Sequence, residues 1–293
     1  MNDVPAPCVR SIVVPRRPLP LLALALLLAF GTGAGPVKGE APMYPRGWPQ
    51  PSAGPSASGD PELILSFDDG PDPANTPPIL DILRDRGIRA VFFQIGWRFQ
   101  RGKVAQTLAV EQRLIREGHL VGNHTINHAH LCASTAEVVK AEVEGARALL
   151  EHATGMPVQW FRTPYGARCP SLERRLAELG LGHFHWDIDP QEWRGLSADS
   201  TARRVIWALA KLDGRAVLLM HDTKFATRYA LPKILDWIDA ENLRRSRTGR
   251  RPIRIVNADV LAVERIAPAT GWVTQALHRG RAAIAATLAG AVP

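Results

Sequence analysis

The chain has 293 residues, 46% of them hydrophobic, so it is long enough to form a large buried core in one or two domains. Its formal charge is +8. This excess favours either a solvated basic surface or contact with an anionic cell envelope, and we expect no nucleic-acid partner.

The N-terminus carries the three parts of an export signal. Arg10, Arg16 and Arg17 precede the apolar run 19–30 (LPLLALALLLAF), which small residues follow. The run is shorter than the roughly 20 residues that span a bilayer, although an uncleaved signal-anchor is an alternative. We predict a signal peptide or signal-anchor over 1–36 and an exported protein, periplasmic or extracellular, with membrane contact only through an uncleaved leader.

Residues 37–60 are rich in Pro, Gly and Ser, which is typical of a linker. Beyond them, short β-type runs alternate with amphipathic helical patterns. The predicted strands are 63–67, 89–96, 119–124, 158–164, 182–189, 215–222 and 253–258. This alternation predicts a parallel sheet covered by helices. About seven units favour a barrel over an open doubly wound sheet, and no G-x-G-x-x-G motif follows a strand.

Polar clusters follow five of these apolar runs. They are Asp68-Asp69, His124 with His128, the stretch 162–165, the stretch 189–193, and His221-Asp222. The C-terminal ends of the strands in a parallel barrel meet at one rim, so we expect all five clusters to converge there.

Two of the clusters together suggest a catalytic metal site. His124 and His128 are four residues apart, a spacing that lets both imidazoles bind one ion, although two surface histidines are the alternative. Asp68 and Asp69 end a strand before Gly70-Pro71, where a bend turns both carboxylates to the rim. One carboxylate can then bind the metal while the other remains a free base. Taken alone, this stretch also fits a helix-capping turn.

Five stretches together resemble the motifs of the polysaccharide deacetylases, known as carbohydrate esterase family 4 or NodB-homology proteins. They are SFDDGPD (66–72), HTINHAHL (124–131), RTPYG (162–166), DPQEW (189–193) and LLMHD (218–222). The resemblance covers about 61–266 and leaves a C-terminal tail, 267–293, of unknown role. It implies an α/β fold, a distorted (β/α)7-type barrel, and metal-dependent removal of acetyl groups from N-acetylated sugars.

The resemblance also assigns the metal ligands and the base. Asp69, His124 and His128 would hold one divalent ion, most commonly zinc, with cobalt, nickel, manganese and iron as alternatives. Asp68 would be the base. Arg162 would pair with Asp68 and keep it ionised, because a nearby cation lowers a carboxylate pKa.

Four further residues match the family's motifs. The backbone amide of Tyr165 would donate to the oxyanion, since the preceding Pro164 has no N–H. His221 would protonate the leaving amine. Trp193 and Leu219, together with Tyr165, would line the sugar groove.

The fourth motif departs from the family pattern. Glu192 stands where the family has Asp before the Trp, and its longer side chain puts the orienting role toward Arg162 and His221 in doubt. Asp189 is the alternative for that role. Three more histidines near the motifs, at positions 130, 183 and 185, are expected to be packed beside aromatic residues.

The chain has three cysteines, and Cys8 lies in the predicted leader. Cys132 and Cys169 remain as an even pair in a compartment that permits disulfides. Each lies four residues after a motif residue, His128 and Tyr165 respectively. We hypothesise a disulfide that joins these two rim loops.

The leading functional hypothesis is an exported N-deacetylase that acts on a GlcNAc-containing polymer such as peptidoglycan, chitin-like chains or poly-GlcNAc. The same site would also suit an O-acetylated xylan or a small cyclic amide. A catalytically inactive wall-binding module is the third hypothesis, but binding alone does not require a base, a metal triad and an acid together.

Overall fold

The computed structural model describes residues 59–257. The predicted leader, nearly all of the linker and the predicted tail lie outside the described residues. No helix within 59–257 has both the length and the apolar character needed to cross a bilayer.

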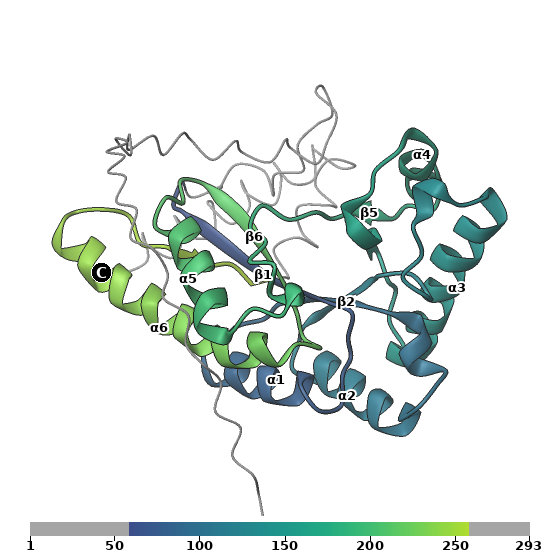
Figure 1. Cartoon of the computed structure of the whole chain (residues 1–293), viewed down its shortest axis with the longest axis horizontal. Coiled ribbons are helices and arrows are strands. Elements are labelled where there is room, and N and C mark those ends of the chain that lie inside the picture. Colours follow the sequence, from purple (N-terminus) through teal and green to yellow (C-terminus); the bar gives the residue numbers. More distant parts are fainter. Residues whose placement is uncertain (1–58, 258–293) are drawn as a thin grey trace, which may run out of the picture. The chain divides into compact units, whose positions relative to one another are not determined.

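Strands and helices alternate along the described chain, as the sequence predicts (Figure 1). The strands are β1 (Glu62–Asp68), β2 (Val91–Gln94), β3 (Leu120–Asn123), β4 (Trp160–Phe161), β5 (Gly182–His183), β6 (Arg215–His221) and β7 (Arg254–Ile255). The α-helices are α1 (Thr76–Asp85), α2 (Val104–Arg116), α3 (Ala136–Thr154), α4 (Pro170–Glu178), α5 (Ala198–Leu209) and α6 (Phe225–Arg247). Short 3-10 turns occur at η1 (Gly96–Phe99), η2 (Leu131–Ala133), η3 (Pro164–Gly166) and η4 (Glu192–Arg194).

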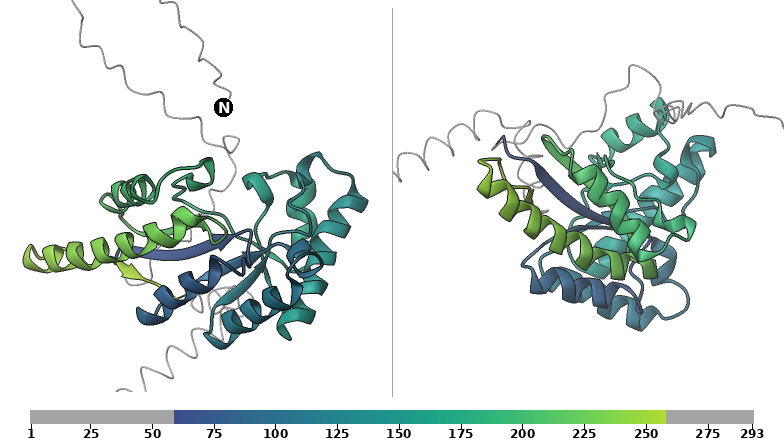
Figure 2. Two further views of the ribbon diagram at one scale, coloured as in Figure 1. Left: turned by 60° about the horizontal axis from the view of Figure 1, so that its bottom comes forward. Right: turned by 60° about the vertical axis from the view of Figure 1, so that its left-hand side comes forward.

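All strand pairs are parallel, in the order β5-β4-β3-β2-β1-β6, with β7 added to β1. Beyond β5 the chain pairs with β6, because Ile188 forms a bridge to Leu218. This contact brings the two ends of the sheet together. The sheet is therefore curled, with helices outside it (Figure 2), and the predicted distorted barrel is confirmed over an open sheet.

The alternation of side chains along β1 separates the two faces of the sheet. Leu63, Leu65 and Phe67 belong to the large core cluster that contains the buried faces of α1, α5 and α6. Ile64 belongs to a second cluster, with residues of β2 and β6. Because successive side chains of a strand point to opposite faces, Ser66 and Asp68 share the inner face with Ile64.

The helix boundaries follow local signals. α3 begins after Thr135, whose Oγ1 accepts a hydrogen bond from the amide of Val138 at 3.4 Å, and ends at Gly155, which has a left-handed φ of 69°. α4 begins at Pro170, a residue favoured at the first helical position, directly after Cys169.

Candidate active site

The predicted strand-end clusters meet at the C-terminal rim of the curled sheet. Asp68 and His221 are register partners on the adjacent strands β1 and β6, which lie side by side in Figure 1. Asp68 is also the register partner of Phe93 on β2. Asp68, His221 and Phe93 therefore lie at the same level on three neighbouring strands.

Asp69 follows the last residue of β1 in a left-handed conformation, with φ 72°. This backbone turn is uncommon for a residue with a side chain, and it ends the regular strand alternation. Arg98 Nε donates a hydrogen bond to the carbonyl oxygen of Asp69 at 2.6 Å. The Asp69 carboxylate is consequently turned to the rim as well, although it neighbours Asp68 in sequence.

Asp69, His124 and His128 form one ligand group, which we call the rim group. Asp69 Oδ1 lies 3.6 Å from Nε2 of both histidines, and one ligand atom of each residue lies within 4.8 Å of the other two. Among the described residues, no group donates a hydrogen bond to this buried oxygen of Asp69. Two imidazoles and one carboxylate form a ligand set for a catalytic divalent ion with open positions.

The pKa shifts of Asp69 and His128 favour metal binding. Burial alone would raise the pKa of Asp69, but the nearby charges of His124, His221 and His128 outweigh it and lower that pKa. Burial, followed by the charge of His124, lowers the pKa of His128. An ionised carboxylate and neutral imidazoles are the forms that ligate metals.

The second motif is a tight turn rather than a helix. Thr125 has φ 70° and His128 has φ 58°, and Thr125 Oγ1 accepts a hydrogen bond from the His128 amide at 2.9 Å. His124 Nδ1 lies 2.7 Å from the carbonyl oxygen of Arg162, which leaves Nε2 facing Asp69. A partner on Nδ1 of this kind fixes the orientation and tautomer of a ligating histidine.

Asp68 lies beside the rim group and pairs with Arg162 inside the sheet. Arg162 Nη1 donates to Asp68 Oδ1 at 2.7 Å and to Ser66 Oγ at 2.9 Å. Both charged residues are buried, and the guanidinium stacks 4.2 Å from the centre of the Phe93 ring. The other oxygen of Asp68, Oδ2, lies 3.7 Å from His124 Nε2. One oxygen of the Asp68 carboxylate therefore lies near the rim group, and the other pairs with Arg162.

Glu192 contacts His221 despite the departure from the family pattern. Glu192 Oε1 accepts hydrogen bonds from the His221 amide at 2.7 Å and lies 2.9 Å from its Nδ1. Burial alone would lower the pKa of His221, but this hydrogen bond and the charges of Glu192, Asp68 and Asp69 raise it to about 9. The carboxylate of Glu192 thus contacts the imidazole despite the extra methylene of its side chain.

The other predicted site residues differ in position. Asp189 Oδ1 accepts a hydrogen bond from the Gln191 amide at 2.7 Å, so Glu192 rather than Asp189 holds the His221 ring. Trp193 is 45% exposed and can present a ring to substrate. Leu219 is only 3% exposed, which limits any contact with substrate to a small part of its side chain.

Tyr165 lies over the second motif. It has φ 61° and is 59% exposed. Its ring packs edge-on against His128, with centroids 4.6 Å apart, and stacks on His130 at 5.6 Å. The Tyr165 ring therefore borders the rim group directly.

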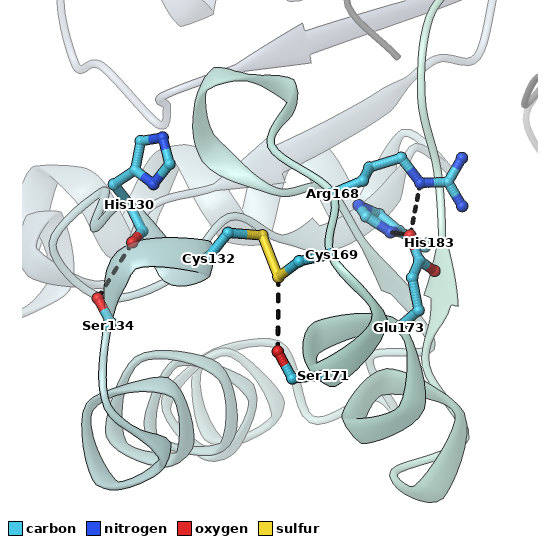
Figure 3. The surroundings of a disulfide bond; sticks show 8 residues. All are labelled: His130, Cys132, Ser134, Arg168, Cys169, Ser171, Glu173 and His183. Atoms are coloured by element: carbon cyan, nitrogen blue, oxygen red, sulfur yellow. Dashed lines mark hydrogen bonds and ion pairs between the residues drawn. A yellow bond between two sulfur atoms is a disulfide. The ribbon is translucent and has the colours of Figure 1, made fainter. Parts of the chain in front are cut away.

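A disulfide joins Cys132 to Cys169 (Figure 3), with their Cα atoms 5.8 Å apart. This is the pairing that the sequence suggested. It links the turn η2, which follows the second motif, to the first residue before α4, which follows the third motif.

The sequence did not reveal several supporting residues. Asp222 does not hold His221; its Oδ2 accepts a hydrogen bond from Thr76 Oγ1 at 2.6 Å, and its carboxylate packs against Gly70, where a Cβ would lie 2.1 Å from it. Arg98 supports the first motif from outside it, and Ser66, within the motif, accepts a hydrogen bond from Arg162. No local pattern marks these contacts, because each depends on the packing of distant elements.

The chain is similar to known polysaccharide deacetylases. The family model for polysaccharide deacetylases matches residues 56–183. A chitooligosaccharide deacetylase of Azorhizobium caulinodans is 32% identical over 161 residues, which are 55% of this chain and 73% of that protein. A peptidoglycan-N-acetylglucosamine deacetylase of Bacillus cereus is 30% identical over 187 residues, 62% of this chain and 84% of that protein.

Solved structures share the fold. The Bc1960 peptidoglycan N-acetylglucosamine deacetylase superposes with a TM-score of 0.58 at 26% identity, covering 68% of this chain and 86% of that one. BA3943 of Bacillus anthracis, a pseudoenzyme of carbohydrate esterase family 4, superposes with a TM-score of 0.59 at 20% identity, covering 69% and 65%. At that identity the likeness to BA3943 concerns the fold alone.

Proposed function

Because the chain belongs to the polysaccharide deacetylase family, we propose that it is a metal-dependent hydrolase that removes N-acetyl groups from a GlcNAc-containing polysaccharide. One observation carries this proposal. Asp68, a buried carboxylate paired with Arg162, lies next to the rim group without being part of it. A binding module would not need an uncoordinated acid at this position.

The residues present fit a divalent ion. Asp69, His124 and His128 would hold it, and the unpartnered buried oxygen of Asp69 supports that assignment. Zinc suits this mixed ligand set, and cobalt, nickel, manganese and iron are alternatives. When bound, the ion would polarise the acetyl carbonyl and lower the pKa of a water toward about 7.

Asp68 would accept the proton of the attacking water. Arg162 Nη1 donates hydrogen bonds to both Asp68 and Ser66, and these contacts fix the direction of the Asp68 carboxylate. A base must lie within hydrogen-bond reach of the proton that it removes. The position of Asp68 Oδ2, 3.7 Å from His124 Nε2, supports this role.

Tyr165 and His221 would complete the reaction. The Tyr165 amide would donate to the oxygen that becomes negative when water adds to the acetyl carbon, a contact typically worth about 3 kcal/mol. His221, kept protonated by Glu192, would give its proton to the sugar nitrogen as the C–N bond breaks. The new C–O bond yields acetate, and the sugar keeps a free amine.

The proposed substrate is a polymer of the cell envelope. The similar proteins named above act, by their names, on chitooligosaccharides and on peptidoglycan. Trp193 and Tyr165 are exposed at the rim and offer aromatic faces to sugar rings. The predicted leader would export the protein to the compartment that contains such a polymer. We expect no nucleic-acid partner.

Acetate release tests the proposal. Purified chain is incubated with N-acetylated chitooligosaccharide, peptidoglycan, acetylated xylan and a cyclic amide, before and after chelation and zinc return. We expect acetate from at least one GlcNAc polymer, lost on chelation and restored by zinc. Release from xylan alone would establish an esterase. No release from any substrate by metal-loaded protein would leave an inactive module and overturn the proposal.

A further inference from the structure

A second group of one carboxylate and two imidazoles shares no residue with the rim group. Glu173 comes from the first turns of α4, and His183 and His185 come from β5 and the residue pair that follows it. We call these three residues the α4–β5 group. His183 and His185 are two positions apart in extended chain, so their side chains leave the same face. Figure 3 shows Glu173 and His183 beside the disulfide.

The geometry of the α4–β5 group is close to that of a ligand set. One ligand atom of each residue lies within 4.8 Å of the other two, and the two imidazole centroids are 4.1 Å apart. Ligand atoms around a tetrahedral zinc ion are about 3.4 Å apart, as follows from Zn–N distances of roughly 2.1 Å. Small side-chain rotations would therefore bring the three residues onto one ion.

His183 has a ring nitrogen available for a ligand. Its side chain is 6% exposed, and its Nε2 is buried without a hydrogen-bond partner among residues 59–257. Its Nδ1 lies 2.9 Å from Glu173 Oε1. Burial lowers the pKa of His183 and lowers that of His185 to about 2, which favours the neutral form of imidazole that binds metal.

Arg168 opposes a cation at this place. Its Nε donates a hydrogen bond to Glu173 Oε1, and its side chain is 10% exposed. A simpler interpretation is that the four residues form a buried hydrogen-bonded cluster that only packs α4 onto β5. That interpretation gives no partner to the buried Nε2 of His183, whereas a metal ion would.

We propose that the α4–β5 group binds a second divalent ion of the zinc class. The ion would join α4 to β5, next to the disulfide that already fixes the start of α4. The carbonyl of His185 accepts a hydrogen bond from Arg162 Nη2 at 3.2 Å, so the ion would also steady the segment that holds Arg162. Its role would be structural and separate from the proposed reaction.

Zinc stoichiometry tests the proposal. Equilibrium dialysis against zinc is carried out with the wild-type chain, with His124→Ala, and with His124→Ala combined with either His183→Gln or His152→Gln. His152 is an exposed histidine near the end of α3 and serves as the matched control. We expect two, one, zero and one ions per chain. If the wild type and His124→Ala each bind one ion, the rim group does not bind zinc but the α4–β5 group does.

Two outcomes would overturn the proposal: His124→Ala binds no zinc, or the His183→Gln double variant still binds one. If His183→Gln does not fold, anomalous scattering from zinc-soaked wild-type crystals tests the site instead. We expect anomalous density between His183 and His185. Absence of that density would refute the proposal. Arg168→Gln should tighten zinc binding at this site about tenfold or more by removing the competing cation. An unchanged affinity would also count against the site.

Discussion

The rim group and the α4–β5 group each consist of one carboxylate and two imidazoles, but their surroundings differ. At the rim, the arginine pairs with Asp68, a carboxylate outside the ligand set. In the α4–β5 group, the arginine pairs with Glu173, the ligand carboxylate itself. The rim also leaves His128 28% exposed at the side chain, against 6% for His183.

This difference teaches that ligand type and spacing do not make a catalytic site. A reacting group needs access and a second, uncoordinated acid, and only the rim group has both. Arg162 contacts the carboxylate that we propose as the base, whereas Arg168 contacts a carboxylate that we propose as a metal ligand. Substitutions at these positions therefore test whether the surroundings of a ligand group determine its role.

Asp68→Asn should produce the largest effect. The amide cannot accept the water's proton, so we expect acetate release to fall by roughly 10²- to 10⁴-fold. The rim group remains intact, and metal content measured on the same sample should be unchanged. Asp85→Asn, at an exposed position of α1, is the control and should keep full activity. Near wild-type turnover by Asp68→Asn would show that another group is the base.

Removal of the disulfide should destabilise the region that links the two groups. The bond closes a loop of 37 residues, and loss of such a constraint typically costs about 2–4 kcal/mol. Urea unfolding of a variant with both Cys132→Ser and Cys169→Ser should show this loss relative to oxidised wild type. Under reducing conditions the difference should vanish. Two reactive thiols in unreduced wild type would contradict the pairing.

Glu192→Gln should move the pH profile of the rim. Glu192 helps to raise the pKa of His221 to about 9, so its removal lowers that pKa. A general acid must be protonated, and the alkaline limb of acetate release should therefore shift to lower pH by about one unit. Glu192→Asp should retain more of the profile. An alkaline limb that does not move would separate Glu192 from the acid.

Glu111→Gln should give the smallest effect and extends the comparison to a buried carboxylate with neither cation nor imidazole. Burial, followed by the charge of Asp222, raises the pKa of Glu111 from 4.5 to about 8. Between these values the folded state holds a proton that the unfolded state lacks, so stability falls as pH rises. The variant should be more stable than wild type at pH about 8, by about 1 kcal/mol or more.

At pH about 3 the two proteins should have similar stability, because the acid is then protonated in both the folded and the unfolded state. Urea unfolding at several pH values measures the difference. Asp222, whose pKa burial raises to about 7, should leave a residual slope in the variant. Parallel stability curves for the two proteins would show that Glu111 does not carry this dependence.

Much of this arrangement can be predicted from local patterns. The alternation of strands and helices gives the parallel sheet, and the positions of Asp68 and His221 after apolar runs place them at one rim. The strand β5 is far shorter than its apolar run, since the chain leaves the sheet after His183 and brings Ile188 against β6. That departure depends on closure of the sheet, which no single segment encodes.

Some contacts between distant side chains could not be predicted, because no family motif or cysteine count indicated them. Asp222 follows His221 in sequence, which suggests an orienting role, but the packing of α1 gives it Thr76 as partner instead. Glu173 and His183 are ten residues apart on different elements, so their pairing appears only when α4 packs on β5.

The left-handed backbone at five non-glycine positions, 69, 125, 128, 165 and 191, has a consequence for protein engineering. Such conformations disfavour β-branched residues and tolerate Asn or Gly. In a library that randomises Thr125 and Gln191, survivors should be enriched in Asn and Gly and depleted in Val and Ile. These turns would thus restrict the tolerated substitutions through backbone shape, even at positions whose side chains take no part in chemistry.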